Sequence, residues 1–309
     1  MRKTVEFATP GTRLSVLHRQ LVIERPELPK LTLPIEDLGV VVVDDVRACY
    51  TQAVFLELLE AGATLMVTGR DHLPLGMMLP LDAHHVQTER HHAQIEASEP
   101  TRKRIWQALI TAKITQQAAV LQRFTGDHGG LTALAGRVRS GDPDNLEAQA
   151  AQRYWPRLFG KEFRRDREQA GVNALLNYGY AVIRAAIARA VVAAGLIPSL
   201  GVFHRNRSNP FCLADDLLEP YRPFVDWRVR LLLEERDVGP GLEDRALRAG
   251  LLSLFNETVL VGGRRNPLLL AIEASAASLC RALTGGEKTL ALPQGLPPDP
   301  EMLDGDEVG

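Results

Sequence analysis

The sequence has few cysteines, no long apolar run and almost no net charge, and each shortage excludes a class of protein. Its 309 residues include three cysteines, which stand far apart and form no CxxC pair. This spacing excludes a zinc ribbon and a disulfide framework, and it is typical of a reducing compartment. The N-terminus lacks the apolar core of a signal peptide. The longest apolar stretch, 185–196, is interrupted by Arg189 and is too short to span a bilayer. We therefore expect a cytoplasmic protein with no membrane partner.

The net charge of the chain is small, but its charged residues are unevenly distributed. The formal net charge of −2 excludes a uniformly basic surface for nucleic acid. Residues 102–167 nevertheless carry 13 Lys and Arg against 6 Asp and Glu, whereas residues 297–309 carry five acids and no base. The acidic end therefore masks a basic middle, and a local basic patch is expected.

The first 82 residues show the pattern of β-strands. Pro and Gly punctuate short runs that alternate or are rich in β-branched residues, which is typical of strands. The expected strands cover residues 4–8, 13–17, 20–24, 31–33, 38–43, 64–68 and 76–79, with a hairpin turn at His18 and Arg19 and one helix over 51–61. This part of the chain predicts a small β-rich N-terminal domain over residues 1–82.

Helical patterns dominate from residue 83 onward. Helices are expected over 84–123, 142–159, 172–194, 215–235 with interruptions at Pro220 and Pro223, 242–260 and 266–283, with Gly262 and Gly263 in a turn between the last two. Asp142 and Asp215 are the expected caps of their helices. Residues 172–194 are apolar nearly all round, so we expect this helix at the centre. The prediction is an α+β fold, with a larger all-α domain over 83–285 and a disordered acidic tail over 286–309.

Residues 201–224 carry the densest group of candidate chemical residues. A loop histidine, His204, is followed by Asp215, Asp216 and Glu219. Asp216 and Glu219 are three residues apart, so on a helix they share one face. Imidazole and carboxylates together can bind a divalent cation. Nearby arginines suit phosphate; they are Arg205, Arg207 and Arg222. The alternative is a helix start capped by an aspartate, with the arginines on a solvated face.

Further candidates lie outside that stretch. Glu147, in the first turns of a predicted helix, could be a metal ligand or simply a favourable charge near the helix N-terminus. The pairs His84-His85 and His91-His92 do not predict a metal site, because adjacent histidines point to different faces of a helix. Tyr178, Tyr180 and Trp155 are expected in the core and not as base-stacking platforms.

Four segments together resemble one known family. They are TGRDHLPLGMMLPL from residue 68, DPDNLEAQAAQRYWPRLFG from 142, VNALLNYGYAVIRAAIARAVVAAGL from 172 and HRNRSNPFCLADDLLEPYRPFVD from 204. In order and spacing they are similar to the CRISPR-associated spacer-acquisition integrases, in the branch that accompanies type II systems. The resemblance extends from about Val5 to Leu283. It implies a β-rich N-terminal domain and an α-helical catalytic domain.

The resemblance also implies a metal site. By position its ligands would be Glu147, His204 and Glu219, with Asp216 as a further catalytic, supporting acid. Carboxylates accept Mg²⁺ or Mn²⁺, and a histidine favours Mn²⁺ without excluding Mg²⁺. His204 could instead be a general base, because its pKa ordinarily lies near neutrality. Cys212 stands where the family pattern favours a small or apolar residue.

The implied reaction joins DNA. The 3′-hydroxyl of a short foreign fragment attacks a phosphodiester at the edge of a CRISPR repeat, and with water as nucleophile the same site cleaves DNA. The residues expected along double-stranded DNA are Arg137, Arg139, Arg164, Arg165, Arg167, Arg205, Arg207 and Arg222. The implied partners are a second copy of the chain, joined through the β domain, and a small ferredoxin-like acquisition protein. The alternatives are a general metal-dependent repair nuclease and a non-enzymatic DNA-bridging scaffold.

Overall fold

The computed structural model describes residues 2–166, 168–235 and 241–298, and its N-terminal part consists of two sheets and one helix. The strands are β1 (Lys3–Phe7), β2 (Arg13–Leu17), β3 (Gln20–Arg25), β4 (Leu28–Pro34), β5 (Leu38–Val43), β6 (Cys49–Tyr50), β7 (Thr64–Thr68) and β8 (Pro74–Met78). One sheet has the order β1-β5-β7-β8 and the other β4-β3-β2-β6. The predicted hairpin joins β2 to β3, and its turn residues His18 and Arg19 have φ of 50° and 58°, as a two-residue turn requires.

Helix α1 (Gln52–Glu60) completes the β-rich core. Its buried Val54 and Leu58 pack into one cluster with Leu14 and Ile23 of the second sheet and Val41 of the first. The two sheets and the helix therefore enclose a core of their own, as the alternating pattern of the sequence predicts.

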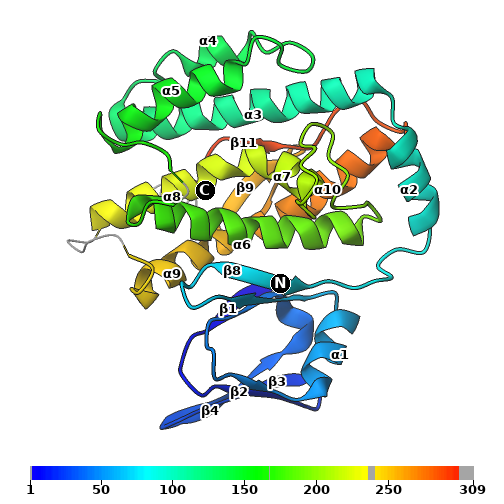
Figure 1. Cartoon of the computed structure of the whole chain (residues 1–309), viewed down its shortest axis with the longest axis vertical. Coiled ribbons are helices and arrows are strands. Elements are labelled where there is room, and N and C mark those ends of the chain that lie inside the picture. The colour runs from blue at the N-terminus through cyan, green and yellow to red at the C-terminus, as the bar shows by residue number, and fades with distance from the viewer. Residues whose placement is uncertain (1, 167, 236–240, 299–309) are drawn as a thin grey trace, which may run out of the picture.

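The sheet containing β5 contributes side chains to the hydrophobic cores of both halves of the molecule. Val40 and Val42 of β5 belong to the core of the helical half, whereas Val41 and Val43 belong to the β-rich core. Every residue of β5 is buried, because successive side chains point to opposite faces and both faces are covered. Figure 1 shows this layer between the lower sheet and the helices. The run LGVVVV is thus explained by burial on both sides.

The second half is mostly helical, which confirms the predicted α+β class. The helices are α2 (Gln87–Glu96), α3 (Glu99–Thr125), α4 (Leu131–Ala135), α5 (Leu146–Phe159), α6 (Val172–Ala193), α7 (Cys212–Leu218), α8 (Arg222–Glu235), α9 (Arg245–Leu252) and α10 (Leu268–Leu283), with 3₁₀ turns at Glu219–Tyr221 and Ser253–Asn256. A further 3₁₀ turn, Ile35–Asp37, lies between β4 and β5 in the N-terminal part. Pro220 lies in the turn between α7 and α8, where one of the two predicted interruptions falls. The other is wrong, because Pro223 is the second residue of α8, a position that tolerates proline.

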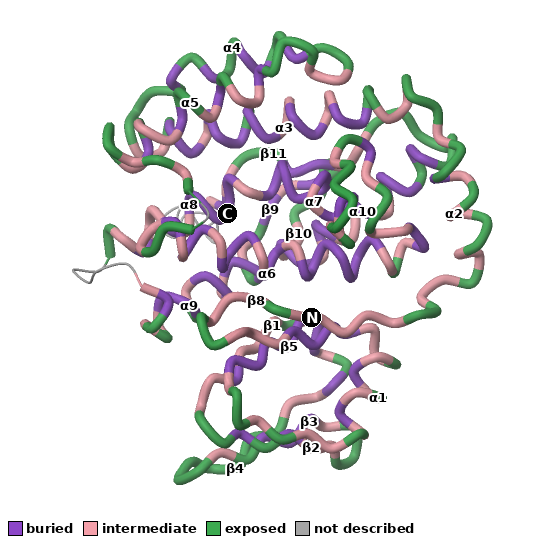
Figure 2. Tube along the Cα trace, in the orientation of Figure 1, coloured by how far each residue is buried: buried purple, intermediate pink, exposed green. Residues whose placement is uncertain are grey.

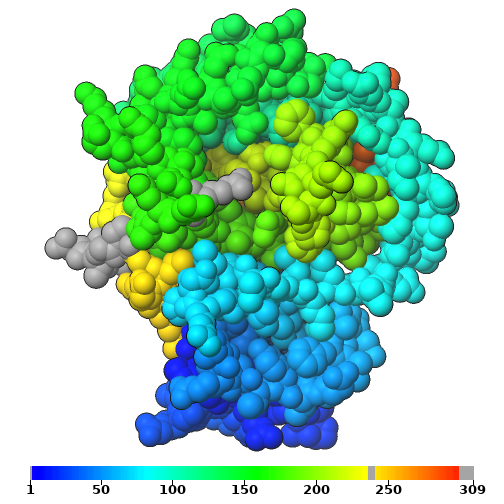
Figure 3. All heavy atoms as spheres, in the orientation of Figure 1, coloured from blue at the N-terminus to red at the C-terminus, as the bar shows by residue number. Residues whose placement is uncertain are grey.

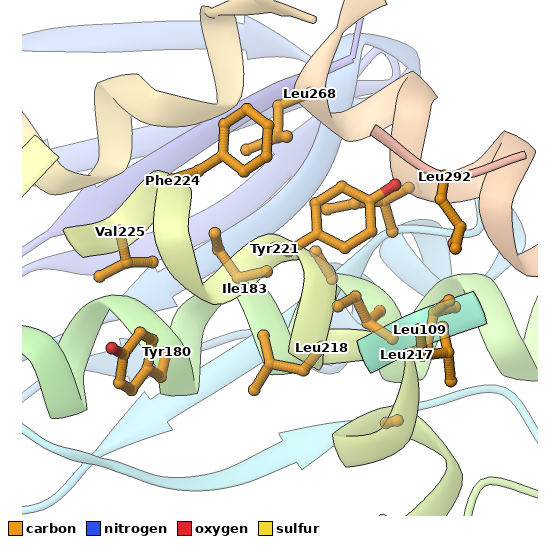
Figure 4. Close-up of a cluster of buried hydrophobic side chains, with 14 of the residues drawn as sticks. Leu109, Tyr180, Ile183, Leu217, Leu218, Tyr221, Phe224, Val225, Leu268 and Leu292 are labelled. Carbon is orange, nitrogen blue, oxygen red and sulfur yellow. The ribbon is translucent and has the colours of Figure 1, made fainter. Parts of the chain in front are cut away.

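Helix α6 is the centre of this half. Figure 2 shows its trace buried along most of its length. By length and composition α6 could cross a membrane, but 78% of its most apolar window is buried inside the protein. Figure 4 shows how Tyr180 and Ile183 of α6 lie beside Leu218 and Val225 of the α7–α8 segment, with Leu109 of α3 close by. This packing fixes α3, α6 and α7 relative to one another, and these helices carry the site described below.

Three predictions for the C-terminal part are wrong. The domain is not all-α, because β9 (Thr258–Val261) pairs with β10 (Arg264–Pro267) and with β11 (Pro293–Gln294). The predicted helix over 242–260 ends instead at Leu252. Gly262 and Gly263 form the β9–β10 hairpin turn, with φ of 58° and 78°, and do not join two helices.

The expected tail is ordered over its first half. Residues 286–298 return across α3 and α10, with Leu292 buried and Ser275 Oγ donating to the carbonyl of Ala291. Gln116 Nε2 donates to the carbonyl of Pro293 at 2.7 Å. The apolar residues Leu290 and Leu292 fasten this segment to the core. The rest of the predicted tail, 299–309, lies outside the described residues.

Candidate metal and DNA site

Asp216 holds the loop that carries His204. Its carboxylate is fully buried, and its Oδ2 accepts from the backbone N–H groups of Val202 at 2.6 Å and Phe203 at 3.1 Å. Its Oδ1 accepts from the backbone N–H of His204 at 3.1 Å. Three charge-assisted hydrogen bonds from successive residues fold the loop around one side chain. Asp216 therefore positions the loop.

The ring of His204 is fixed on two sides. Its Nδ1 lies 2.7 Å from Asp216 Oδ1, and Trp106 of α3 meets the ring edge-on with centroids 5.6 Å apart. Trp106 in turn stacks on Phe203, at 4.0 Å between ring centroids. The hydrogen bond to Asp216 raises the pKa of His204, with burial acting in the opposite direction. The bond at Nδ1 leaves Nε2 as the nitrogen that faces outward for a cation or a proton.

Lys113 brings two of the predicted ligands together. Its Nζ lies 2.5 Å from Oε1 of Glu147 and 2.5 Å from Oε2 of Glu219. The two carboxylate oxygens are therefore separated by at most twice that distance. Glu147 stands in the first turn of α5, Glu219 follows α7, and Lys113 projects from α3. Three distant segments thus meet at one ammonium group.

Burial and charge act against each other in this cluster. Desolvation would raise the pKa of Glu219, but Arg222 and Lys113 outweigh it and hold the pKa well below its usual range. Arg222 Nε donates to Oε1 of Glu219 at 2.9 Å. Burial likewise opposes the charge of Lys113, and the two glutamates overcome it, so the pKa of Lys113 is raised. Glu219 is therefore held as a carboxylate, the form that binds a cation.

The donor set fits a hard divalent cation, although its ligands are not preassembled. Within the residues that the structure describes, no three His, Cys, Asp or Glu side chains are grouped as a ready metal site. Glu147 and Glu219 instead share a cation that the protein itself supplies. Carboxylates are the ligands that Mg²⁺ and Mn²⁺ accept in proteins, and a histidine favours Mn²⁺ over Mg²⁺. Glu147, Glu219 and His204 are the residues that could hold such an ion.

A cavity with a basic lining adjoins His204. It has a volume of about 280 Å³ and lies between the α5–α6 connection and the loop after α6. In Figure 3 the green and yellow-green segments rise on either side of this hollow. Its charged and polar lining comprises Arg165, Arg184, Arg222, Asn177, Tyr180, His204, Asn206, Asn209 and Asp215. Three guanidinium groups beside a histidine form a site suited to phosphate.

The predicted DNA-binding arginines differ in how they are held. Arg137, Arg164, Arg205 and Arg207 are exposed, and Arg139 is exposed but paired with Asp144 at 2.8 Å. Arg222 lies over the ring of Tyr180, at 4.8 Å from its centroid, and Arg165 lies over the same ring at 5.4 Å. Arg167 lies outside the described residues. The exposed and the cavity-lining arginines therefore form two different groups.

Two expectations about helix caps need correction. Asp215 is not a cap, because α7 begins at Cys212; its carboxylate accepts from Asn209 Nδ2 at 2.6 Å. Helix α5 begins at Leu146 with Asn145 as its cap, three residues later than predicted. Asp142 still accepts from the backbone N–H of Leu146 at 2.9 Å, so its carboxylate serves this helix end from outside it.

Sequence reasoning missed Lys113 and Arg184. Lys113 lies four residues after the buried Leu109, on the face of α3 that packs into the core. A lone lysine in a buried helical stripe is a signal for a buried partner. Arg184 lies one turn after Tyr180 on α6 and lines the cavity. Lys113 lies outside the four segments that carry the family resemblance, whereas Arg184 lies within the segment 172–196, where the resemblance gave it no role.

Gly201 permits the loop to close on Asp216, and its replacement should open it. A Cβ at this position would lie 2.5 Å from the carbonyl oxygen of His204 and 2.8 Å from Oδ2 of Asp216. We expect Gly201→Ala to lower stability by roughly 1–3 kcal/mol and to impair DNA cleavage by displacing His204. Urea unfolding and a cleavage assay measure the two effects. Gly136→Ala is the control, because its Cβ would meet nothing nearer than 3.8 Å; equal behaviour of the two variants would contradict this account.

Asp226 is a buried carboxyl beneath the cavity and predicts a pH dependence. Tyr154 and Tyr180 both donate to it, yet burial raises its pKa from 3.8 to about 7. The folded state therefore binds more protons than the unfolded state between these values. The contribution of Asp226 to the free energy of unfolding is therefore largest below about pH 4. It falls as the pH rises toward 7, by up to about 1.4 kcal/mol per pH unit. In Asp226→Asn, thermal unfolding from pH 5 to 8 should lack this fall; an unchanged slope would contradict the assignment.

Comparison with known proteins places the chain in a class and then in a family. Among solved structures, a casposase bound to integration product matches with a TM-score of 0.77 at 22% identity, over 94% of this chain and 92% of that chain. A Cas6-RT-Cas1–Cas2 complex matches with a TM-score of 0.72 at 17% identity, over 93% of this chain and 35% of that chain. These likenesses establish the fold, β-rich then helical.

The family follows from the sequence. The model of the CRISPR associated protein Cas1 family matches residues 7–253. The CRISPR-associated endonuclease Cas1 of Neisseria meningitidis serogroup C (strain 8013) is 37% identical over 294 residues, 93% of this chain and 94% of the relative. The chain belongs to the Cas1 family, which confirms the resemblance found in its four segments.

Proposed function

We propose that this chain is a metal-dependent DNA endonuclease and integrase that inserts short foreign DNA fragments as new spacers into a CRISPR array. The observation that carries the proposal is the meeting of Glu147 and Glu219 at one cation, the ammonium group of Lys113, in a member of the Cas1 family. The name of the Neisseria relative supports the cleavage, and the casposase with its integration product shares the fold. We propose residues 83–285 as the catalytic part.

The reaction we propose is a transesterification. The 3′-hydroxyl oxygen of the fragment forms a bond to the phosphorus at the repeat edge, and the bond from that phosphorus to its 3′-oxygen breaks. The fragment's hydroxyl proton is lost and the departing oxygen gains one, so charge balances. A Mg²⁺ or Mn²⁺ ion held by Glu147, Glu219 and His204 would supply charge neutralisation at the phosphate. With water in place of the hydroxyl, the same arrangement cleaves DNA.

The chain's own residues position the DNA. His204, held by Asp216, presents Nε2 toward the reacting phosphate, as a ligand or as a base. Arg165, Arg184 and Arg222 line the adjoining cavity and would clamp a backbone phosphate. The exposed group would follow the DNA backbone and set its position without reading sequence; it comprises Arg137, Arg139, Arg164, Arg205 and Arg207.

The β-rich part, residues 1–82, is the proposed dimerisation domain. Strand β4 lies at the edge of its sheet, and Leu28 and Leu31 on it are exposed. An exposed edge strand with apolar side chains is a ready surface for pairing with another chain. A small ferredoxin-like protein is the second partner that we propose, and the solved neighbour that contains Cas1 and Cas2 supports it.

A joining assay tests the function. Purified protein with its acquisition partner receives Mn²⁺, a repeat-bearing supercoiled plasmid and a labelled fragment that ends in a 3′-hydroxyl. We expect label to enter the plasmid at the repeat edge, and a matched fragment that ends in a 3′-hydrogen not to join, because it lacks the nucleophile. Cleavage without joining would favour a general repair nuclease. Binding without either reaction would favour a DNA-bridging scaffold.

A further inference from the structure

The cation that joins Glu147 to Glu219 is part of the protein. Lys113 Nζ lies 2.5 Å from a carboxylate oxygen of each. The exposed fractions of the side chains are 10% for Lys113, 29% for Glu147 and 4% for Glu219. The second oxygen of Glu219 is engaged by Arg222. Glu219 is therefore neutralised on both sides by charges that belong to this chain.

Without Lys113 the two carboxylates would face each other in a poorly solvated place. Like charges at this separation repel, and burial strengthens the repulsion. Breaking a buried ion pair by removing one partner is costly, because the remaining charge is uncompensated. Lys113 therefore lets α3, α5 and the α7–α8 turn pack together before any external ion arrives.

The same position is where a divalent ion would have to lie. An ion that ligates both carboxylates must stand close to both oxygens, at about 2.0–2.1 Å for Mg²⁺. The ammonium group already occupies the space between those oxygens. Two cations cannot share it, because each would repel the other and each needs the same lone pairs.

We propose that Lys113 is a built-in counter-ion that competes with the divalent metal for Glu147 and Glu219, and so sets the metal affinity of the site. Metal entry displaces the ammonium group of Lys113 from both carboxylates. The lysine is a positioning residue, since it acts through the two carboxylates that it contacts. This inference rests on the proposed function for the identity of the metal ligands.

Metal binding without DNA tests the inference directly. Mn²⁺ is titrated into wild type and Lys113→Met, and free Mn²⁺ is measured by electron paramagnetic resonance. We expect the variant to bind Mn²⁺ on the order of tenfold to a hundredfold more tightly, because the competing charge is gone. We also expect its metal-free form to melt at a lower temperature and to gain more from Mn²⁺ than wild type does. Equal or weaker Mn²⁺ binding would overturn the proposal.

Matched variants make the result specific. Lys103→Met removes a lysine from the same helix, where it pairs with the exposed Glu99 at 2.8 Å, and should leave Mn²⁺ affinity unchanged. Lys113→Arg keeps the charge and should not tighten binding. If Lys113→Met does not fold without metal, Lys113→Gln replaces it with a neutral side chain that can still donate to one carboxylate, and the same tightening is expected. Tightening in Lys103→Met or Lys113→Arg as large as that in the neutral variants would overturn the proposal.

Glu147→Gln separates this inference from the proposed function. If it binds Mn²⁺ as wild type does, the assignment of the metal site is wrong and the role of Lys113 falls with it. If Glu147→Gln loses Mn²⁺ while Lys113→Met binds as wild type does, only the competition by Lys113 is wrong. Loss in the first variant together with tightening in the second supports both.

Discussion

Replacing Glu147 with glutamine is expected to reduce metal-dependent DNA cleavage and joining on the order of a thousandfold. Glutamine keeps the size of the side chain but removes the charge that a divalent ion requires, and such an ion contributes several kcal/mol to the transition state. Glu147 is partly exposed and lies in the first turn of α5. Folding should therefore survive the change better than it would survive the loss of the buried Glu219. Initial cleavage rates with Mn²⁺ and branched DNA measure the loss of activity, and thermal unfolding measures the change in stability.

Asp144→Asn is the matched control for that change. Asp144 stands three residues earlier, is exposed and pairs with Arg139, so its loss should change cleavage less than about twofold. Equal activity of Glu147→Gln and wild type would contradict the account. An equal loss in Asp144→Asn would show that the charge of the segment matters and that Glu147 has no special role.

Replacing Arg248 with methionine is expected to lower the free energy of unfolding by about 3–5 kcal/mol, the largest stability effect that we foresee. Arg248 of α9 connects the two halves of the molecule: it contacts Glu6 of β1 at 3.1 Å and Asp44 at 2.9 Å. All three side chains are buried. Removing the guanidinium group would leave two buried carboxylates without the cation that pairs with both. Two contacts would remain: Tyr178 would still donate to Glu6, and His72 would still contact Asp44. Denaturant unfolding monitored by circular dichroism measures the loss.

Neutralising the two acids that pair with Arg248 should recover the lost stability. Changing Glu6 to glutamine and Asp44 to asparagine in the Arg248→Met background should restore much of the stability, because no uncompensated charge then remains. Arg281→Met removes an exposed partner of Glu287 and should cost less than about 1 kcal/mol. If Arg248→Met costs no more than Arg281→Met, the network does not join the two halves as we describe.

Much of the fold could be predicted from the sequence, because the hydrophobic pattern of a segment largely determines whether it forms a strand or a helix. The run LGVVVV became β5, buried on both faces, and the apolar residues 172–193 became the central helix α6. Both elements are long or strongly patterned, so tertiary contacts reinforce the local preference. Strand β9, TVLV, is only four residues long, too short for its pattern to separate strand from helix, and β10 and β11 carry no strand pattern. Their pairing depends on Gly262 and Gly263 in a hairpin and on the return of residues 286–298, which is a long-range event.

The candidate site could also be predicted only in part from the sequence. Glu147, His204, Asp216 and Glu219 could be selected from residue type, spacing and resemblance to a family. The phase of α7 could not: it begins at Cys212, and this start turns Asp216 inward to the histidine loop and leaves Asp215 beside Asn209. The pairing of Lys113 with Glu147 and Glu219 joins residues 34 and 106 positions apart. No local pattern encodes such a contact, because it depends on how three helices pack.

Anomalous diffraction from crystals of the full chain grown with Mn²⁺ would locate the metal itself. The account predicts one manganese peak within bonding distance of Glu147, Glu219 and His204, with Lys113 Nζ withdrawn from both carboxylates. A peak elsewhere in the molecule, or no peak with the ammonium group still between the two glutamates at saturating Mn²⁺, would contradict it.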